Sequence, residues 1–278
     1  VALAGVIGGP ISGLIMTYLD GVATLKGWQW LFLIEGSPAV ILGVVVALYL
    51  ENSPKEARWL TETERGWLMM QLDAESMQKE QSGHIIGFNK ALCNVKLWLL
   101  SLVYFSIIMG LYGISFWLPQ IVSDLVHQNL VLTGLLSAIP YCLAAIGMVL
   151  IGHSSDRHNE RGWHIALSAL LGSFGLIICA IYLSNLPLAL LGLSFASIGI
   201  MSALPVFWSL PTAFLSGTAA AGGIAVINAC GNLAGYLSPV MVSWIKSLTG
   251  NFTGTLYMLA SWLLVAVVIV LVKFRRAP

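Results

Sequence analysis

Eight predominantly apolar stretches, each about twenty residues long, account for most of this 278-residue chain. A helix of that length crosses the hydrocarbon core of a bilayer. Charged residues make up only 9% of the chain, against roughly 25% in a water-soluble domain, so the polar surface is too small to cover the apolar side chains in water. The sequence therefore predicts an all-α polytopic membrane protein with eight transmembrane helices. The predicted spans are residues 1–19, 28–50, 97–122, 130–152, 163–183, 186–208, 219–245 and 255–273.

The longest connection between spans, residues 51–96, is polar and holds seven of the twelve acidic and six of the thirteen basic residues. Two short sequences in it have the pattern of a helix start. "SPKE" at 53–56 is a capping box with Pro54 at the first helical position, and "TETE" at 61–64 offers a second start. Apolar residues one turn apart follow, so we expect a helix here. A solvated linker helix and a helix lying on the membrane surface both suit this pattern.

Lys and Arg are distributed unequally between the two sides of the predicted membrane. If the eight spans alternate in direction, eleven of these residues lie on the side of the 51–96 loop, the 152–163 segment and the C-terminus. The other side keeps only Lys26 and Lys246. An excess of cations marks the cytoplasmic side. The sequence thus predicts a multi-pass protein of the cell inner (plasma) membrane with both termini in the cytoplasm.

A charged turn, "GHSSDRHNERGW" at 152–163, interrupts two apolar spans. In one interpretation, Asp156 accepts backbone N–H groups at a helix start while Arg157 pairs with a neighbouring helix. Such a cluster would close the cytoplasmic side and would have to break when that side opens. In the other interpretation, the turn is a solvated, cation-rich loop. The residues alone favour neither.

Two spans, a long polar loop and six further spans form an arrangement that resembles the major facilitator superfamily. Its members have six helices, a cytoplasmic linker and six more. The family carries a G-x-x-x-D-R-x-x-x-R type motif at the position of the charged turn. The matching residues are Gly152, Asp156, Arg157 and Arg161, whereas Glu160 departs from the usual basic character. By this resemblance, residues 1–50 are the last two helices of a first half, 51–96 the linker, and 97–278 a complete second half.

Four segments are similar to the anion:cation symporter family, which includes phthalate, tartrate and sugar-acid permeases. They are "GWQWLFLIEGSPAVILG" (27–43), "SPKEARWLTETER" (53–65), "GLYGISFWLPQIV" (110–122) and "FWSLPTAFLSGTAAAGGIAVINACGNLAGY" (207–236). The resemblance implies a secondary active transporter that imports a small organic anion, a sugar acid or an aromatic or dicarboxylate anion. It also implies that protons are the coupling ion and that transport proceeds by alternating access. The charged turn would then be a gating latch. No cofactor is implied.

Polar side chains inside spans are candidate contacts for a substrate, because they are costly in lipid and often functional. Asn228, Asn232 and Tyr236 recur every four residues and so share one helix face, beside a ridge of Gly231 and Gly235. In one interpretation, the two Asn amides hydrogen-bond a substrate's hydroxyl or carboxylate oxygens. The alternative is that they bond across to a neighbouring helix.

Three further residues are candidate substrate contacts. Tyr112 lies between two glycines, although aromatic residues at helical spacing are more often packing residues. Trp208 and Ser209 lie between two prolines, which should distort the end of that span and leave carbonyl groups free. The alternative, which the residues favour equally, is that the prolines mark an ordinary helix end.

The remaining features of the spans point mainly to packing. Gly5, Gly9 and Gly13 form a ridge that predicts close helix contact. Glu35 is the one carboxylate set into a span; it suits a proton site less well than a structural bond to backbone or to the preceding loop. No acidic or basic residue is central in any predicted span, so we expect this stretch of chain not to transport alone.

Two other classes of function compete with transport. An enzyme is disfavoured because the chain has no HExxH or GxSxG motif, and its four cysteines have no metal-ligand spacing. A non-transporting membrane remnant or interaction protein stays open, because the chain begins inside an apolar run at Val1 and resembles the C-terminal part of something longer.

Overall fold

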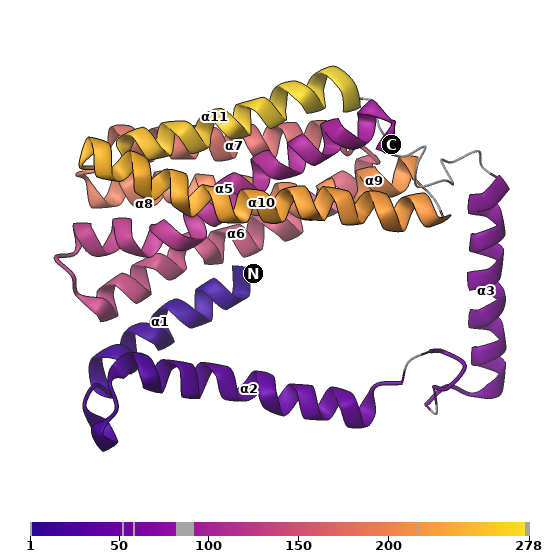
Figure 1. Ribbon diagram of the computed structural model, residues 1–278, viewed down its shortest axis with the longest axis horizontal. Coiled ribbons are helices and arrows are strands. Elements are labelled where there is room, and N and C mark those ends of the chain that lie inside the picture. The colour runs from indigo at the N-terminus through magenta and orange to yellow at the C-terminus, as the bar shows by residue number, and fades with distance from the viewer. Residues whose placement is uncertain (1, 52, 58, 82–91, 216, 276–278) are drawn as a thin grey trace.

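The structure of the chain, a computed structural model, describes residues 2–51, 53–57, 59–81, 92–215 and 217–275 as helices joined mostly by short turns (Figure 1). Within these ranges, seven helices are long and apolar enough to cross a membrane. These are α2 (Gly27–Tyr49), α5 (Val95–Leu125), α6 (Leu130–His158), α7 (Gly162–Ile181), α8 (Leu186–Phe207) with the short α9 (Ser209–Phe214), α10 (Gly217–Thr249), and α11 (Thr253–Ile269) with its π-helical end η2 (Val270–Phe274).

The chain is thus an integral membrane protein, as the composition predicted. The remaining predicted span, residues 1–19, corresponds to α1 (Ala2–Tyr18). This apolar helix has 17 residues and is shorter than the seven spans above. A short 3-10 turn, η1 (Val22–Thr24), joins α1 to α2.

Asparagine side chains fix where three of the long helices begin. Asn94, Asn129 and Asn185 precede α5, α6 and α8, and the side-chain oxygen of each accepts a backbone N–H two or three residues further on. Such caps satisfy donors that the first turn of a helix leaves without an intrahelical partner.

Six long helices form one bundle. Helix α5 contacts α8, α10 and α11, while α7 packs on α8 and α11, and α6 packs on α8. Figure 1 shows these helices running roughly along one direction, with α3 (Glu62–Gln81) lying crosswise beyond their ends. Small residues allow close approach within the bundle. A Cβ on Gly175, for example, would lie 2.5 Å from the backbone oxygen of Gly192 on the next helix.

Helix α1 joins the bundle through α6. Gly9 and Gly134 face each other so closely that a Cβ on Gly9 would lie 3.1 Å from the carbonyl oxygen of Gly134. A Cβ on Gly13 would lie 2.7 Å from the oxygen of Leu130. The predicted glycine ridge is therefore a helix-packing surface. Helix α2 contacts α1 but is exposed along nearly its whole length.

Of the two helix starts that the sequence offered in the linker, only the second begins a helix. Thr61 caps α3: its backbone N–H and its hydroxyl both donate to Oε2 of Glu64, at 3.0 and 2.7 Å. The helix start predicted at "SPKE" is wrong, because residues 54–56 form only a turn. The carbonyls of Ala57 and Leu60 accept hydrogen bonds from the Arg65 guanidinium, which ties this turn to the start of α3.

The sixth predicted span is broken, as its two prolines suggested. Helix α8 ends at Phe207 and α9 begins at Ser209, with Trp208 between them. The Ser209 hydroxyl donates to the carbonyl oxygen of Val206 at 2.7 Å. One carbonyl at the break is therefore capped locally rather than left free.

Candidate functional site

The polar face predicted on α10 is exposed. Asn228, Asn232 and Tyr236 all lie on the outside of the bundle, and 68% of Tyr236 is accessible. Neither Asn amide hydrogen-bonds another residue in the described part of the chain, so the interpretation that they join α10 to a neighbouring helix has no support here. Lipid would leave these amides without partners, which favours a polar environment for this face.

Two tyrosines of α5 hold α10 in place through its glycines. The ring of Tyr104 fills the space beside Gly231, where a Cβ would lie 2.5 Å from Cδ1. Tyr112 does the same at Gly235, where a Cβ would lie 2.9 Å from Cε2. The hydroxyl of Ser238 on α10 then donates to the carbonyl oxygen of Met109 on α5 at 2.7 Å. The glycine ridge thus seats α10 on α5 and leaves the Asn face outward.

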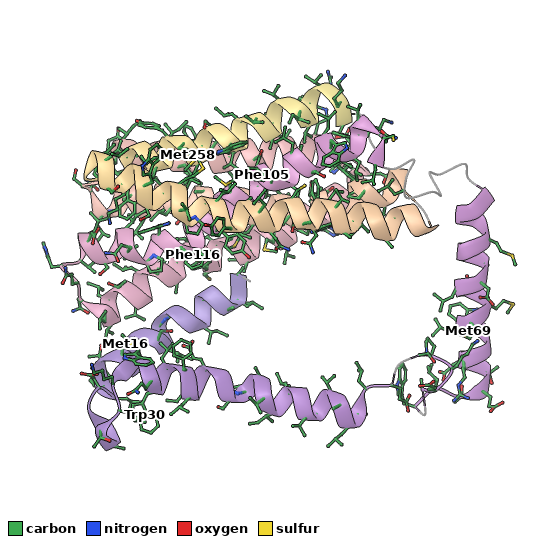
Figure 2. The ribbon with its side chains drawn as sticks, in the orientation of Figure 1. Met16, Trp30, Met69, Phe105, Phe116 and Met258 are labelled. Atoms are coloured by element: carbon green, nitrogen blue, oxygen red, sulfur yellow. The ribbon has the colours of Figure 1, made fainter. Side chains whose placement is uncertain are left out.

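The aromatic candidates lie at the two ends of this contact. Tyr112 is half-buried and stacks on Phe116, with ring centroids 6.0 Å apart. Phe116 is exposed and labelled in Figure 2. Trp208 is half-buried at the break between α8 and α9, with its ring 4.8 Å from that of Tyr104. Ser209 is half-buried, and its hydroxyl proton is engaged by Val206.

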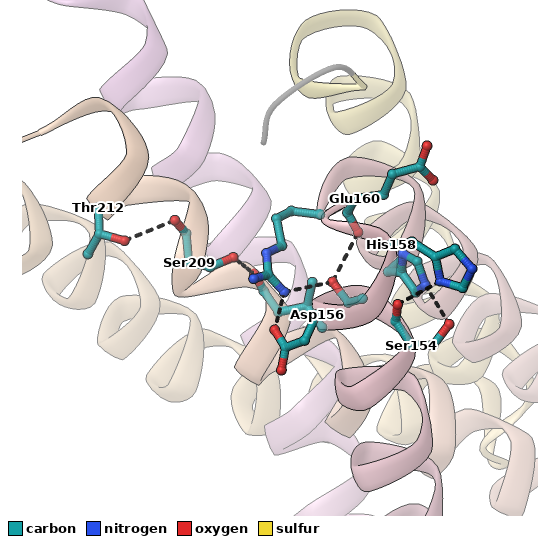
Figure 3. A network of polar contacts seen from close by, with 10 residues as sticks. Ser154, Asp156, His158, Glu160, Ser209 and Thr212 are labelled. Atoms are coloured by element: carbon teal, nitrogen blue, oxygen red, sulfur yellow. Dashed lines mark hydrogen bonds and ion pairs between the residues drawn. The ribbon is translucent and has the colours of Figure 1, made fainter.

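The charged turn has its own network, drawn in Figure 3. Arg161 Nη1 lies 2.5 Å from Asp156 Oδ1 and donates to Ser155 Oγ at 3.0 Å. The buried Ser155 hydroxyl in turn donates to the backbone oxygen of Glu160 at 3.0 Å. Asn159, with φ of 50°, ends α6 in the left-handed region. These contacts tie the end of α6 to the start of α7.

The roles expected of Asp156 and Arg157 need correction. Helix α6 runs on to His158, so Asp156 lies in its last turn and not at a helix start. Free backbone N–H groups occur at the other end of a helix, and a carboxylate here opposes the helix dipole unless a cation offsets it. Arg161 supplies that cation. Arg157 is exposed and pairs with no described residue, and a Cβ on Gly152 would meet nothing within 4 Å.

Two histidines adjoin this network. His158 Nδ1 lies 2.9 Å from the carbonyl oxygen of Ser154, and His164 Nε2 lies 3.1 Å from the Ser154 hydroxyl. Because a carbonyl only accepts hydrogen bonds, Nδ1 of His158 carries a proton. The two rings lie 6.3 Å apart. The described residues contain no group of three His, Cys, Asp or Glu side chains placed to hold a metal ion.

Glu35 has a partner that the sequence did not predict. It accepts a hydrogen bond from the Ser12 hydroxyl at 2.7 Å, which joins α2 to α1. The expected partner, backbone or the preceding loop, is therefore wrong. A Ser side chain on a helix twenty-three residues earlier gives no local signal in the sequence.

A second charged contact was missed altogether. Lys246, near the end of α10, lies 3.9 Å from the centroid of the Phe252 ring and 3.9 Å from Asp124 Oδ2 at the end of α5. Gln120 Nε2 donates to the other oxygen of Asp124 at 2.8 Å. This cluster joins the ends of α5 and α10 on the side opposite the charged turn.

The sequence of the chain is similar to those of known proteins. The sequence model of the Major Facilitator Superfamily matches residues 1–239. Two Agrobacterium vitis proteins, each named "Putative tartrate transporter", are 42% and 44% identical over 99% of this chain, which covers 60% and 63% of their length. The Pseudomonas putida "Putative metabolite transport protein NicT" is 38% identical over 97% of the chain, which covers 61% of that relative. The chain thus spans about three fifths of the length of these relatives.

Proposed function

Because the chain belongs to the Major Facilitator Superfamily, whose members are transporters and not enzymes, we propose that it serves secondary active import of a small organic anion. A tartrate-like hydroxy acid is the first candidate, since the two relatives with 42% and 44% identity carry tartrate in their names. Aromatic and other dicarboxylate anions follow. Protons are the coupling ion in this proposal, and import proceeds by alternating access.

The arrangement of halves belongs to this proposal. Residues 1–50 supply two helices of a first half, 51–96 the linker, and 97–278 the six helices of the second half. The orientation places the linker and both termini in the cytoplasm and the protein in the inner membrane. The unequal distribution of Lys and Arg supports this orientation.

The observation that carries the proposed site is the unpartnered amide pair of α10. Asn228 and Asn232 are exposed on one face of α10, without hydrogen bonds to described residues. Amides bind carboxylate or hydroxyl oxygens without the cost of a buried charge. Tyr112 packs against Gly235 of this helix, and Trp208 contacts Tyr104, which packs against Gly231. Ser209 adjoins Trp208. We assign substrate contact to Asn228, Asn232, Tyr112, Trp208 and Ser209, at the interface where transporters of this architecture bind substrate.

The charged turn is the proposed cytoplasmic latch, with Gly152, Asp156, Arg157 and Arg161 as its motif. The Arg161–Asp156 pair and the buried Ser155 support it, because they make the turn a defined structure and not a loose loop. Arg157, exposed in this structure, is free to reach a partner in another conformation.

The test uses the protein expressed from its complete reading frame and reconstituted in liposomes. Asn228→Ala and Asn232→Ala should each raise the KM for radiolabelled tartrate by the equivalent of about 1–3 kcal/mol, the cost of a lost buried partner. Thermal stability should change little. Loss of stability with an unchanged KM would assign both residues to packing. Absence of uptake for tartrate and for a panel of small carboxylates would overturn the transport proposal.

A further inference from the structure

The ring of Tyr104 lies where three elements meet. It comes from α5, stacks on Phe207 at the end of α8 with centroids 5.1 Å apart and planes at 21°, and meets the edge of Trp208 at 4.8 Å. On its other side it touches α10 at Gly231. The residue is 8% exposed, so almost all of its surface is in contact with these neighbours.

The size of this ring helps to set how far α10 lies from the break between α8 and α9, because Gly231 meets its Cδ1–Cε1 edge while Phe207 stacks on its face. Gly231 leaves no room beyond the ring, since even a Cβ there would overlap it. Phe207 is fully buried and cannot retreat. A packed interior does not absorb such a change without moving its neighbours. Tyr104 is therefore a spacer between α10 and the break between α8 and α9, in addition to the direct contacts of α10 with α5 and α9.

Two proposed substrate contacts lie close to the spacer, one on α10 and one at the break between α8 and α9. Asn228 is three residues before Gly231, which places it about 60° around the axis of α10 and close to one turn nearer the N-terminal end of that helix. Trp208 touches the same ring, with the two ring planes at 62°. Tyr112 differs from Tyr104 in being half-exposed and stacked on an exposed Phe116, so it has surface left for a substrate, whereas Tyr104 has almost none.

We propose that Tyr104 is a positioning residue for substrate recognition: its buried ring holds Asn228 and Trp208 at the separation that one small anion bridges. The inference rests on the proposed function, because it presupposes that these two side chains contact the substrate. It adds a residue that acts through others and does not touch the substrate itself.

The neighbouring residue offers a matched control. Phe105, labelled in Figure 2, is also an aromatic residue of α5 in an aromatic pair, but its ring packs on Trp262 of α11, with centroids 5.1 Å apart. Tyr104→Leu and Phe105→Leu remove rings of similar size from the same helix. Both should lower thermal stability, so stability alone does not separate the two roles.

Tartrate uptake separates them. Tyr104→Leu should raise KM about tenfold with a smaller change in kcat, while Phe105→Leu should leave KM within about twofold. Tyr104→Phe, which keeps the ring, should behave like the native protein. Gly231→Ala should raise KM as Tyr104→Leu does, and the two changes together should raise it less than additively, since they act on one contact.

A second measurement needs no substrate. With Asn228→Cys in a background lacking the four native cysteines, the rate of alkylation by a maleimide reports the surroundings of position 228. Tyr104→Leu should change this rate several-fold, and Phe105→Leu should not. Equal effects of the two Leu variants on KM and on alkylation would overturn the positioning role. If Asn228→Ala leaves KM unchanged while Tyr104→Leu alters the alkylation rate, the spacer stands and the proposed substrate contact fails.

Discussion

The contact between α1 and α6 predicts opposite effects on stability for two glycine substitutions, one at the closely packed Gly134 and one at the open Gly8. In Gly134→Ala, the new Cβ would overlap the carbonyl oxygen of Gly9 and lie 3.0 Å from its carbonyl carbon. Carbon atoms in contact are about 3.5–4.0 Å apart, so α1 has to retreat by roughly 0.5–1 Å. Such a gap forfeits about a quarter to a half of each dispersion contact along the interface.

The net free energy can be worked from these terms. Overpacking of this kind costs about 1–3 kcal/mol. Replacing Gly by Ala in a helix returns at most about 1 kcal/mol, and less where the unfolded state in the membrane already keeps its helices. Gly134→Ala should therefore destabilise the protein by about 1–2 kcal/mol. Gly8→Ala, one residue from Gly9 on α1, meets nothing within 4 Å and should be neutral or slightly stabilising.

Thermal unfolding of the purified protein in detergent, followed by tryptophan fluorescence, measures the difference. Each kcal/mol corresponds to about 2–4 °C in Tm for a domain of this size class, so Gly134→Ala should melt several degrees below Gly8→Ala. Equal melting temperatures would refute the reasoning, because they would mean that α1 and α6 do not pack through these glycines in the protein as purified.

Three further predictions concern the charged turn and the linker. Arg161→Gln and Asp156→Asn should each slow uptake about two- to fivefold, the range expected of an ion pair at the protein surface, and should leave insertion intact; uptake at the native rate would reduce the turn to a solvated loop. Glu62→Cys, on a side chain that is 98% exposed, should react with an impermeant maleimide only after cells are permeabilised; labelling of intact cells would reverse the orientation. Hydrogen bonds from the Thr61 side chain and backbone lower the pKa of the Glu64 carboxyl below its ordinary 4.5. The cap's stabilisation is thus present above that ordinary pKa and is lost as pH falls through the lowered pKa. Because amide exchange itself slows in acid, the quantity to measure is the protection factor, which should fall at the start of α3 on acidification. Thr61→Ala removes the hydroxyl bond and keeps the backbone bond to Glu64, so it should weaken this pH dependence.

The sequence predicted the helices well because length and apolarity decide them. Lipid admits few alternatives to a helix of about twenty apolar residues, and the asparagines at 94, 129 and 185 mark starts that local chemistry enforces. The same reasoning failed at "SPKE", where the helix-start pattern is present but the chain forms only a turn. The Arg65 guanidinium bonds the Ala57 carbonyl from eight residues further on, and the capping pattern does not encode that contact.

The candidate site was predictable only in part. The four-residue spacing of Asn228 and Asn232 shows that they share a face, but not whether that face is buried against another helix. The partner of Asp156 depends on where α6 ends, and helix ends are the least certain feature of a sequence. The contact of Tyr104 with Trp208 joins residues 104 positions apart along the chain, and no local pattern encodes such a contact.

The sparse charge of the membrane helices has an electrical consequence. Glu35 is the one charged side chain more than about a turn from the end of a spanning helix in the described part of the chain. Moving one elementary charge across the whole membrane potential is worth about 2.3 kcal/mol per 100 mV. A rearrangement of these helices therefore carries at most about one gating charge, and the two amides of α10 carry none. Reorientation of the empty protein should barely respond to voltage through this part of the chain, so that the field acts on transport chiefly through the charges of the anion and its coupling ion.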